Sequence, residues 1–255
     1  MKKISKVLIA SSFIFVSINA FASLDDCYIA GSSHDYNAVK KECLKYAGKD
    51  KDATTILSGT YAYNNDGVNA QKYLQIYIDN FAKNNKDTSI LAKNYTSLGN
   101  YYYFGEDGAK KDTQKGLQYI TKGAELGNVT AQEQLGNFYL VEGEYPSQNM
   151  AISYKWFEIA SINGSQEAEQ SYILTHLDDM KAQAGYCLAM GEQLVAQSYI
   201  DGNDGLLVDT SKAKKYLNDA IALYKDKKPT KEILEHCPPQ KGLDLANAEK
   251  LLASL

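Results

Sequence analysis

The sequence predicts an all-α fold, a right-handed alpha-alpha superhelix in which helix hairpins stack into a solenoid. Two observations predict it. A pattern of apolar and small residues recurs along the chain, and its first two copies, which begin at Leu98 and Leu135, are 37 residues apart. No segment shows the alternation of apolar and polar residues that is typical of a half-buried strand. Because one helix hairpin cannot bury its apolar face alone, we expect repeated hairpins to stack into a continuous core.

The repeated pattern describes a two-helix unit. Each copy has an aliphatic residue, a tyrosine four positions later and another aromatic residue 21 positions after the first, at Leu98, Tyr102 and Tyr119, at Leu135, Tyr139 and Trp156, and at Val195, Tyr199 and Tyr216. Residues four apart share one face of a helix, so the first two members of each set are expected in the core. In the first unit we expect the first helix to end near Gly105 and Asp112 or Thr113 to cap the second.

The repeats set the expected organisation of the chain. The clearest copies are predicted over 91–127, 128–164 and 188–224. The expected flanking elements are degenerate units over 35–82 and 165–187, and capping helices over 230–255, at 230–235 and 243–254. No low-complexity linker interrupts 23–255, which we therefore expect to form one domain.

The repeated motif resembles that of the SEL-one-like repeat family, relatives of the tetratricopeptide repeats with a slightly longer unit. The match covers LG-x-x-Y-x-x-G, an internal glycine, D-x-x-K, the aromatic residue and a closing A/G-x-x-G, and it is specific over 98–127 and 195–220. The middle unit departs from the pattern, with Glu142 in place of glycine, Asn149 in place of aspartate and Pro146 in the loop. The resemblance implies a non-catalytic protein-binding solenoid whose first helices line a concave wall.

The first 22 residues have the pattern of a secretory signal peptide. Lysines at 2, 3 and 6 precede a largely apolar run over 7–21, and Ala20-Phe21-Ala22 presents small residues where a signal peptidase cuts. A membrane anchor is the alternative, but about 15 apolar residues fall short of the ~20 that span a bilayer. A lipoprotein is disfavoured because Asp25 and Asp26 precede Cys27. We therefore expect cleavage after Ala22 and export to the periplasm, or beyond the cell.

The charge of the chain excludes some partners. All 27 basic residues are lysines, and the net charge is −4. Cleavage after Ala22 would remove three lysines, which leaves 24 against 31 acidic residues and a net charge of −7. Nucleic acids and anionic lipids both require a basic surface, so we expect neither, and no membrane insertion after cleavage. A basic protein partner remains compatible with this charge.

The four cysteines, Cys27, Cys43, Cys187 and Cys237, are an even number in an exported chain, which predicts disulfides. Three pairings are possible. We favour Cys27–Cys43 and Cys187–Cys237, because each pair then lies within one end of an elongated chain. A metal site that uses a histidine beside the cysteines is the alternative, but no C-x-x-C spacing supports it.

The sequence contains no motif that indicates catalysis. The H-E-x-x-H, G-x-S-x-G, phosphate-loop and dinucleotide-binding patterns are absent. The three histidines, His34, His176 and His236, are far apart, and distant repeats of a solenoid do not meet. The segment 201–205 lacks the ligand spacing of a calcium loop, because Leu206 and Lys212 stand where a glycine and an acid are needed. We expect no metal, no cofactor and no enzyme activity.

The expected binding residues follow from helical geometry. If Leu98 and Tyr102 face the core, residues about 180° around the same helix face outward, including Tyr103. Exposed tyrosine and aliphatic side chains on such a face favour protein binding. The predicted partner-binding residues of the three units are Lys93, Thr96, Asn100, Tyr103, Thr130, Glu133, Asn137, Leu140, Met190, Gln193, Gln197 and Ile200.

The resemblance to this family makes the expected function more specific. Exported members of the similar family act as adaptors in envelope and host-interaction processes, and some small periplasmic ones neutralise lipase effectors of the type VI secretion system. The most specific expectation is thus an immunity protein that binds such a toxin. The alternatives are an envelope adaptor for a cell-wall enzyme or outer-membrane protein, and a β-lactam or cell-wall hydrolase, for which the sequence shows no activated nucleophile.

Overall fold

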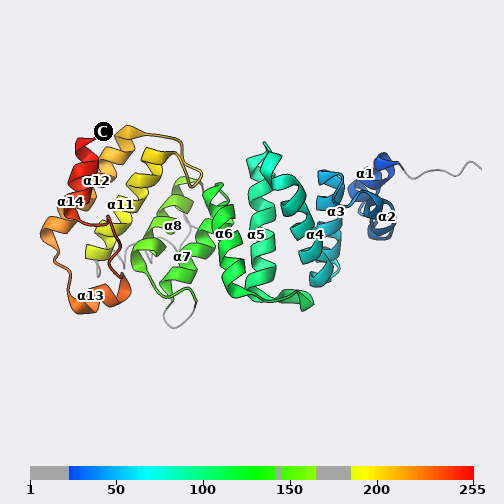
Figure 1. Cartoon of the computed structure of the whole chain (residues 1–255), viewed down its shortest axis with the longest axis horizontal. Helices are drawn as coiled ribbons and strands as arrows, with labels where there is room; N and C mark the ends of the chain where they lie inside the picture. The colour runs from blue at the N-terminus through cyan, green and yellow to red at the C-terminus, as the bar shows by residue number, and fades with distance from the viewer. Residues whose placement is uncertain (1–22, 142–144, 165–184) are drawn as a thin grey trace, which may run out of the picture.

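The computed structural model describes residues 23–141, 145–164 and 185–255. Over these residues it is the all-α solenoid that the sequence predicts, with helices stacked side by side along one long axis (Figure 1). The predicted signal peptide and residues 165–184 of the predicted degenerate unit lie outside the described residues.

The helices are α1 Leu24–Ser32, α2 Tyr36–Glu42, α3 Lys51–Tyr63, α4 Gly67–Phe81, α5 Thr88–Phe104, α6 Thr113–Glu125, α7 Val129–Leu140, α8 Met150–Ile162, α11 Gly185–Asp201, α12 Thr210–Asp226, α13 Lys231–His236 and α14 Leu245–Ala253. Short 3-10 turns lie at Cys43–Tyr46, Ala82–Asn84 and Glu106–Gly108.

The predicted register of the repeat is confirmed. Leu98 in α5, Leu135 in α7 and Val195 in α11 are each 0% exposed, and each belongs to the first helix of a hairpin. The hairpins are α5–α6, α7–α8 and α11–α12. The repeated apolar position is therefore a core position in all three units.

The second helix of each hairpin begins in the same way. Asp112, Asn149 and Asp209 cap α6, α8 and α12 with their side chains. The backbone N–H of each cap donates to the carbonyl of the repeated tyrosine, over 2.6, 2.8 and 3.0 Å. Asn149 thus replaces aspartate in the middle unit without loss of the cap, since its side-chain oxygen accepts from the N–H of Ile152.

Glycines let the two helices of the first hairpin approach closely. A Cβ built on Gly116 of α6 would lie 2.4 Å from the backbone nitrogen of Tyr103, and one on Gly99 of α5 would lie 2.7 Å from the nitrogen of Ile120. No real Cβ is tolerated at these distances. The face of α5 that contains Gly99 and Tyr103 is therefore pressed against α6.

The third hairpin is inverted relative to the first two. The α5–α6 and α7–α8 connections lie at the same edge of the solenoid, which we call the loop edge. The α6–α7 turn lies at the opposite edge of the solenoid, which we call the turn edge. The α11–α12 connection lies at the turn edge, beside the end of α8 (Figure 1). There the side-chain amides of Gln132 and Asn163 both donate to the carbonyl of Asp204, over 2.9 and 3.2 Å. Helices α8 and α11 consequently run in the same direction.

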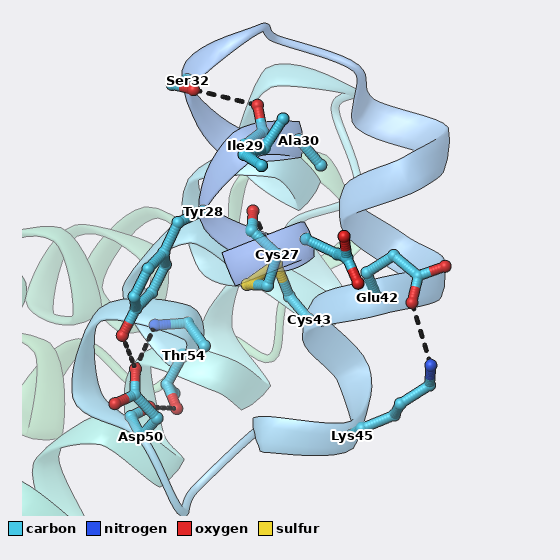
Figure 2. The surroundings of a disulfide bond; sticks show 12 residues. Cys27, Tyr28, Ile29, Ala30, Ser32, Glu42, Cys43, Lys45, Asp50 and Thr54 are labelled. Carbon is cyan, nitrogen blue, oxygen red and sulfur yellow. Dashed lines mark hydrogen bonds and ion pairs between the residues drawn. A yellow bond between two sulfur atoms is a disulfide. The ribbon is translucent and has the colours of Figure 1, made fainter. Parts of the chain in front are cut away.

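The N-terminal end is closed by α1 and α2 against the α3–α4 hairpin. A disulfide joins Cys27 of α1 to Cys43, and the Tyr28 hydroxyl donates to the Asp50 carboxylate, which also caps α3 (Figure 2). The sequence did not lead us to expect α1. Its signal is a capping box, in which Ser23 and Asp26 exchange hydrogen bonds at the start of the helix.

The C-terminal end is closed by α13 and α14, close to the predicted 230–235 and 243–254. The second disulfide joins Cys187 near the start of α11 to Cys237 just after α13. Both disulfides have the pairing that the sequence favours, and no cysteine is free. Leu243, Leu245 and Leu251 pack on the core of α11 and α12. No helix among the described residues is long and apolar enough to cross a membrane.

Candidate binding surface

The predicted partner-binding residues do not all reach the surface. Eight are exposed or half-buried, namely Lys93, Asn100, Thr130, Glu133, Asn137, Leu140, Gln197 and Ile200. The other four, Thr96, Tyr103, Met190 and Gln193, are buried. The expectation that Tyr103 is exposed is wrong, because its side chain is only 8% accessible. None of these four is available for binding in the described structure.

Two faces of a first helix are buried rather than one. Leu98 and Tyr102 lie in the core, as predicted, where they pack with residues of α4. Thr96 and Tyr103 lie on the opposite side, against Gly123 and Gly116 of α6. A helix inside a solenoid has neighbours on both sides, so the side opposite one core face is itself a core face. Only the strip between the two faces remains exposed.

In the third repeat the C-terminal segment covers part of the predicted stripe. The Gln193 amide donates to the carbonyl of Gly242 over 2.8 Å, and its oxygen accepts from the Tyr224 hydroxyl over 2.9 Å. Met190 belongs to the core that includes Leu217 of α12 and Ala248 of α14. Met190 and Gln193 are therefore structural residues at the closed end of the solenoid.

The surface left accessible on the first two repeats is a strip along α5 and α7, which we call the α5–α7 seam. Its members recur at the 37-residue spacing of the repeat, as Lys93, Ser97, Asn100 and Phe104 on α5 and as Thr130, Gln134, Asn137 and Val141 on and just after α7. Sequence reasoning found four of these and missed Ser97, Phe104, Gln134 and Val141. The signal that could have found them is their spacing of four, three and four residues, which follows one helix face.

An aromatic patch lies at the loop edge of the seam. The ring of Tyr103 stacks on that of Phe138, with centroids 4.2 Å apart, and Phe104 meets Phe138 edge-on at 6.2 Å. The Tyr103 hydroxyl donates to the carbonyl of Tyr145. Phe104, Val141 and Tyr145 remain 43%, 45% and 46% exposed. The buried Tyr103 thus supports a surface of apolar side chains that the chain itself does not cover in the described structure.

The middle of the seam contains two side-chain amides with an unmet hydrogen-bonding group. The Asn100 Oδ1 and the Gln134 Oε1 are both buried from solvent, and neither accepts a hydrogen bond from any of the described residues. Asn100 lies one turn before Tyr103, and Gln134 lies one turn before Phe138. Because α5 and α7 run in the same direction and Tyr103 stacks on Phe138, the two amides lie at the same level of the seam.

The turn edge of the seam is hollowed. A hollow of about 340 Å³ lies where α5 and α7 begin, lined by Thr88, Ser89, Ala92, Lys93, Leu126, Gly127, Asn128, Val129 and Thr130. Lys93 is the only charged residue in this lining, and the hydroxyls of Thr88, Ser89 and Thr130 accompany it. The predicted residues Lys93 and Thr130 therefore meet at one place, at the opposite end of the seam from the aromatic patch.

Polar groups buried elsewhere hold the repeats together. The Asp204 carboxylate accepts from Lys155 over 2.8 Å and from the Ser198 hydroxyl over 2.5 Å. The Tyr154 hydroxyl donates to the Glu192 carboxylate over 2.6 Å, and burial, followed by the Glu192 charge, raises the pKa of that phenol. These groups join α8 to α11. No group of three or more metal-binding side chains occurs in the described part of the chain.

The described residues form a solenoid of stacked helix hairpins with an exposed seam along α5 and α7. The Sel1 repeat family matches residues 95–128, 129–165 and 182–223. The chain therefore contains three Sel1 repeats, and repeats of this family are generally non-catalytic scaffolds for protein–protein binding.

Comparison with solved structures gives a further similarity. The chain is 16% identical to a Sel1 repeat protein from Oxalobacter formigenes, with a TM-score of 0.40, over 74% of this chain and 45% of that one. The chain therefore spans less than half the length of that protein. No curated protein sequence matches the chain.

Proposed function

We propose that the chain is a non-catalytic module that holds a partner protein on the α5–α7 seam. The observation that carries the proposal is the aromatic patch at the loop edge. Phe104, Val141 and Tyr145 are each more than two-fifths exposed, and they gather around a stacked Tyr103–Phe138 pair. Aromatic residues that are supported by packing yet left accessible are typical of the energetic centre of an interface, since they bury much apolar area at little entropic cost.

The finer proposal concerns compartment and partner. Two disulfides are expected of an oxidising compartment, and together with the predicted signal peptide they support the periplasm. The resemblance to small exported Sel1-like proteins supports an immunity role, in which the chain neutralises a type VI secretion lipase effector or a similar toxin. A net charge of −7 after cleavage favours a basic partner, because charge complementarity speeds and orients association.

The test compares partner capture by matched variants. The exported chain is used to capture the products of neighbouring genes and of a periplasmic extract, with Phe104→Asp as the seam variant and Leu207→Asp as the control. Leu207 is also an exposed apolar residue, but it lies in the α11–α12 connection and not on α5 or α7. The proposal expects one specific protein to be captured by the wild type and by Leu207→Asp but not by Phe104→Asp.

The identity of the captured protein distinguishes an immunity role from an envelope-adaptor role. Capture of a toxin whose growth inhibition is relieved by the chain supports immunity, whereas capture of a cell-wall enzyme or an outer-membrane protein replaces immunity with the envelope-adaptor alternative. Failure to capture any specific protein, or equal capture by both variants, would overturn the seam as the binding surface.

A further inference from the structure

The α7–α8 connection, which contributes Val141 and Tyr145 to the aromatic patch, is held from both sides. From α5, the Tyr103 hydroxyl donates to the carbonyl of Tyr145. From the C-terminal end of the chain, the Nδ1 of His236 lies 2.7 Å from the Oε1 of Gln148, although the two residues are 88 positions apart in sequence. The aromatic patch is therefore joined to α13 by a direct side-chain contact.

Gln148 extends this contact to the end of α7. Its Nε2 donates to the carbonyl of Leu140 over 2.8 Å, so its Oε1 is the acceptor that faces His236, and the Nδ1 of His236 is the donor. Leu140 is the last residue of α7, and it directly precedes Val141, which is 45% exposed in the aromatic patch. The two hydrogen bonds of Gln148 thus fix the base of the connection relative to α13.

Helix α13 has little packing of its own. It has six residues, none of them buried, and it lies at the loop edge (Figure 1). Ile233 packs on the core but remains half-buried. A helix this short is not stable without tertiary contacts. Cys237 follows α13 directly, is 0% exposed and is joined to Cys187 of α11, so the disulfide is the covalent tether that holds His236 against Gln148.

We propose, on the basis of the function proposed above, that the Cys187–Cys237 disulfide keeps the aromatic patch in its binding shape, so that the chain binds its partner only after this disulfide has formed. His236 and Gln148 act as positioning residues, because they transmit the position of α13 to the α7–α8 connection. The Cys27–Cys43 disulfide lies in the cluster of α1 to α4 at the other end of the solenoid and has no such role.

The chemistry of this step is thiol–disulfide exchange. The Sγ atoms of Cys187 and Cys237 become bonded, and the two thiols release two electrons and two protons. A disulfide donor, either a protein or a small molecule, takes them up and becomes a pair of thiols. Oxidising compartments maintain such donors, whereas the cytosol keeps thiols reduced. The inferred coupling therefore restricts partner binding to an oxidising compartment.

Hydrogen–deuterium exchange measured by mass spectrometry tests the coupling without any partner. The reporter is the backbone N–H of Asn149, which donates to the carbonyl of Tyr139 across the base of the connection. The test variants are Cys187→Ala with Cys237→Ala, and Gln148→Met, which removes both hydrogen bonds of Gln148 and leaves the disulfide intact. The matched controls are Cys27→Ala with Cys43→Ala, and Ser147→Ala, at an exposed position in the same connection.

We expect exchange at residues 145–149 to be at least fivefold faster in both test variants and to change less than twofold in both controls. Exchange within α5 should stay as in the wild type, which shows that the solenoid is still folded. Gln148→Met added to the variant without the C-terminal disulfide should give no further increase, because both changes break one linkage. Reduction by dithiothreitol of the variant that lacks only Cys27 and Cys43 should reproduce the increase.

The consequence for binding is tested by photo-crosslinking in the cell, with a photoreactive phenylalanine derivative at position 104. At equal amounts of exported protein, the wild-type and control backgrounds should give the same specific adduct. The two test backgrounds should give at least fivefold less of it. Because Gln148→Met retains both disulfides, a loss of the adduct in this background cannot be attributed to a missing covalent bond.

Two outcomes would overturn the inference: exchange at residues 145–149 that does not respond to loss of the C-terminal disulfide, or an adduct whose yield is the same in test and control backgrounds. Neither outcome refutes the proposed function, since the adduct from position 104 still shows a partner on the α5–α7 seam. Absence of any specific adduct from the wild-type chain would instead refute the proposed function, and the inference with it.

Discussion

Gly127 in the α6–α7 turn lies against Gly205 in the α11–α12 connection, so close that a Cβ on Gly205 would be 2.5 Å from the Gly127 Cα. The two glycines belong to the first and third repeats. In a regular solenoid each repeat contacts only its neighbours. The contact arises because the third hairpin is inverted, which brings its connection back over the second repeat to the turn edge. The α5–α7 seam therefore belongs to a structure in which direct contacts join all three repeats.

Asp204 lies at the centre of this contact, and its negative charge should stabilise the folded protein. Asp204→Asn removes the charge opposite Lys155 inside a pair whose side chains are only 4% and 17% exposed. Asparagine tolerates the positive φ of 57° at this position, so backbone strain does not contribute. We expect a loss of about 2 kcal/mol in the free energy of unfolding, measured by urea denaturation. The control Asp201→Asn, at an exposed position, should change it by less than about 0.5 kcal/mol.

The close pairing of α5 and α6 predicts opposite effects for two glycine substitutions. Gly59→Ala, in the interior of α3 with nothing within 4 Å of the new Cβ, should stabilise the protein by up to ~1 kcal/mol through helix propensity. Gly116→Ala should destabilise it by at least ~2 kcal/mol, because its Cβ meets the backbone of Tyr103 and forces the helices apart. Thermal unfolding of both variants checks this. Equal stabilisation by both would mean that α5 and α6 are not closely packed.

The orphan amides predict a gain in stability when one is removed. Gln134→Met keeps the length of the side chain and removes a buried oxygen without a donor, so the free energy of unfolding should rise by up to ~1 kcal/mol. Gln132→Met is the matched control. Gln132 is fully buried and its amide donates to the carbonyls of Ala124 and Asp204, so its replacement should cost ~2 kcal/mol. A loss of stability in Gln134→Met would mean that the Gln134 oxygen is not an unpaired acceptor in the folded chain.

Alkaline pH should weaken the fold through the buried tyrosines. Burial raises the pKa of Tyr154 and Tyr224, and in Tyr154 the Glu192 charge adds to it. Above pH ~10 the unfolded chain loses phenolic protons that the folded chain keeps, so stability falls as pH rises, by about 1.4 kcal/mol per pH unit for each such group. Urea midpoints measured from pH 8 to 11 should decline, and Tyr154→Phe should reduce the slope. No decline in the wild type would contradict the account.

The register of the repeats could be predicted from the sequence, but the exposed face could not. Leu98, Leu135 and Val195 are core residues because a 37-residue pattern of apolar positions indicates stacked hairpins. The pattern does not indicate how many neighbouring helices contact the first helix of a hairpin. Tyr103 was predicted to be exposed, but it lies on a second buried face, in the α5–α6 contact. The exposed positions, including Phe104, lie about one residue further around the helix.

The inverted third hairpin depends on contacts that no local pattern encodes. Leu135 and Val195 are 60 residues apart instead of 37, which indicates a break in the repeat but not its direction. The direction becomes evident from Gln132 and Asn163, which both donate to the carbonyl of Asp204. The burial of Met190 and Gln193 likewise depends on where the C-terminal segment folds back.

The most direct test of the α5–α7 seam as the binding surface is site-specific photo-crosslinking in the intact cell. A photoreactive phenylalanine derivative is placed at Phe104 in one variant and at Leu207 in another, and crosslinked proteins are identified by mass spectrometry. The account predicts one specific adduct from position 104 and none from position 207. A specific partner that crosslinks from position 207 and not from position 104 would contradict it.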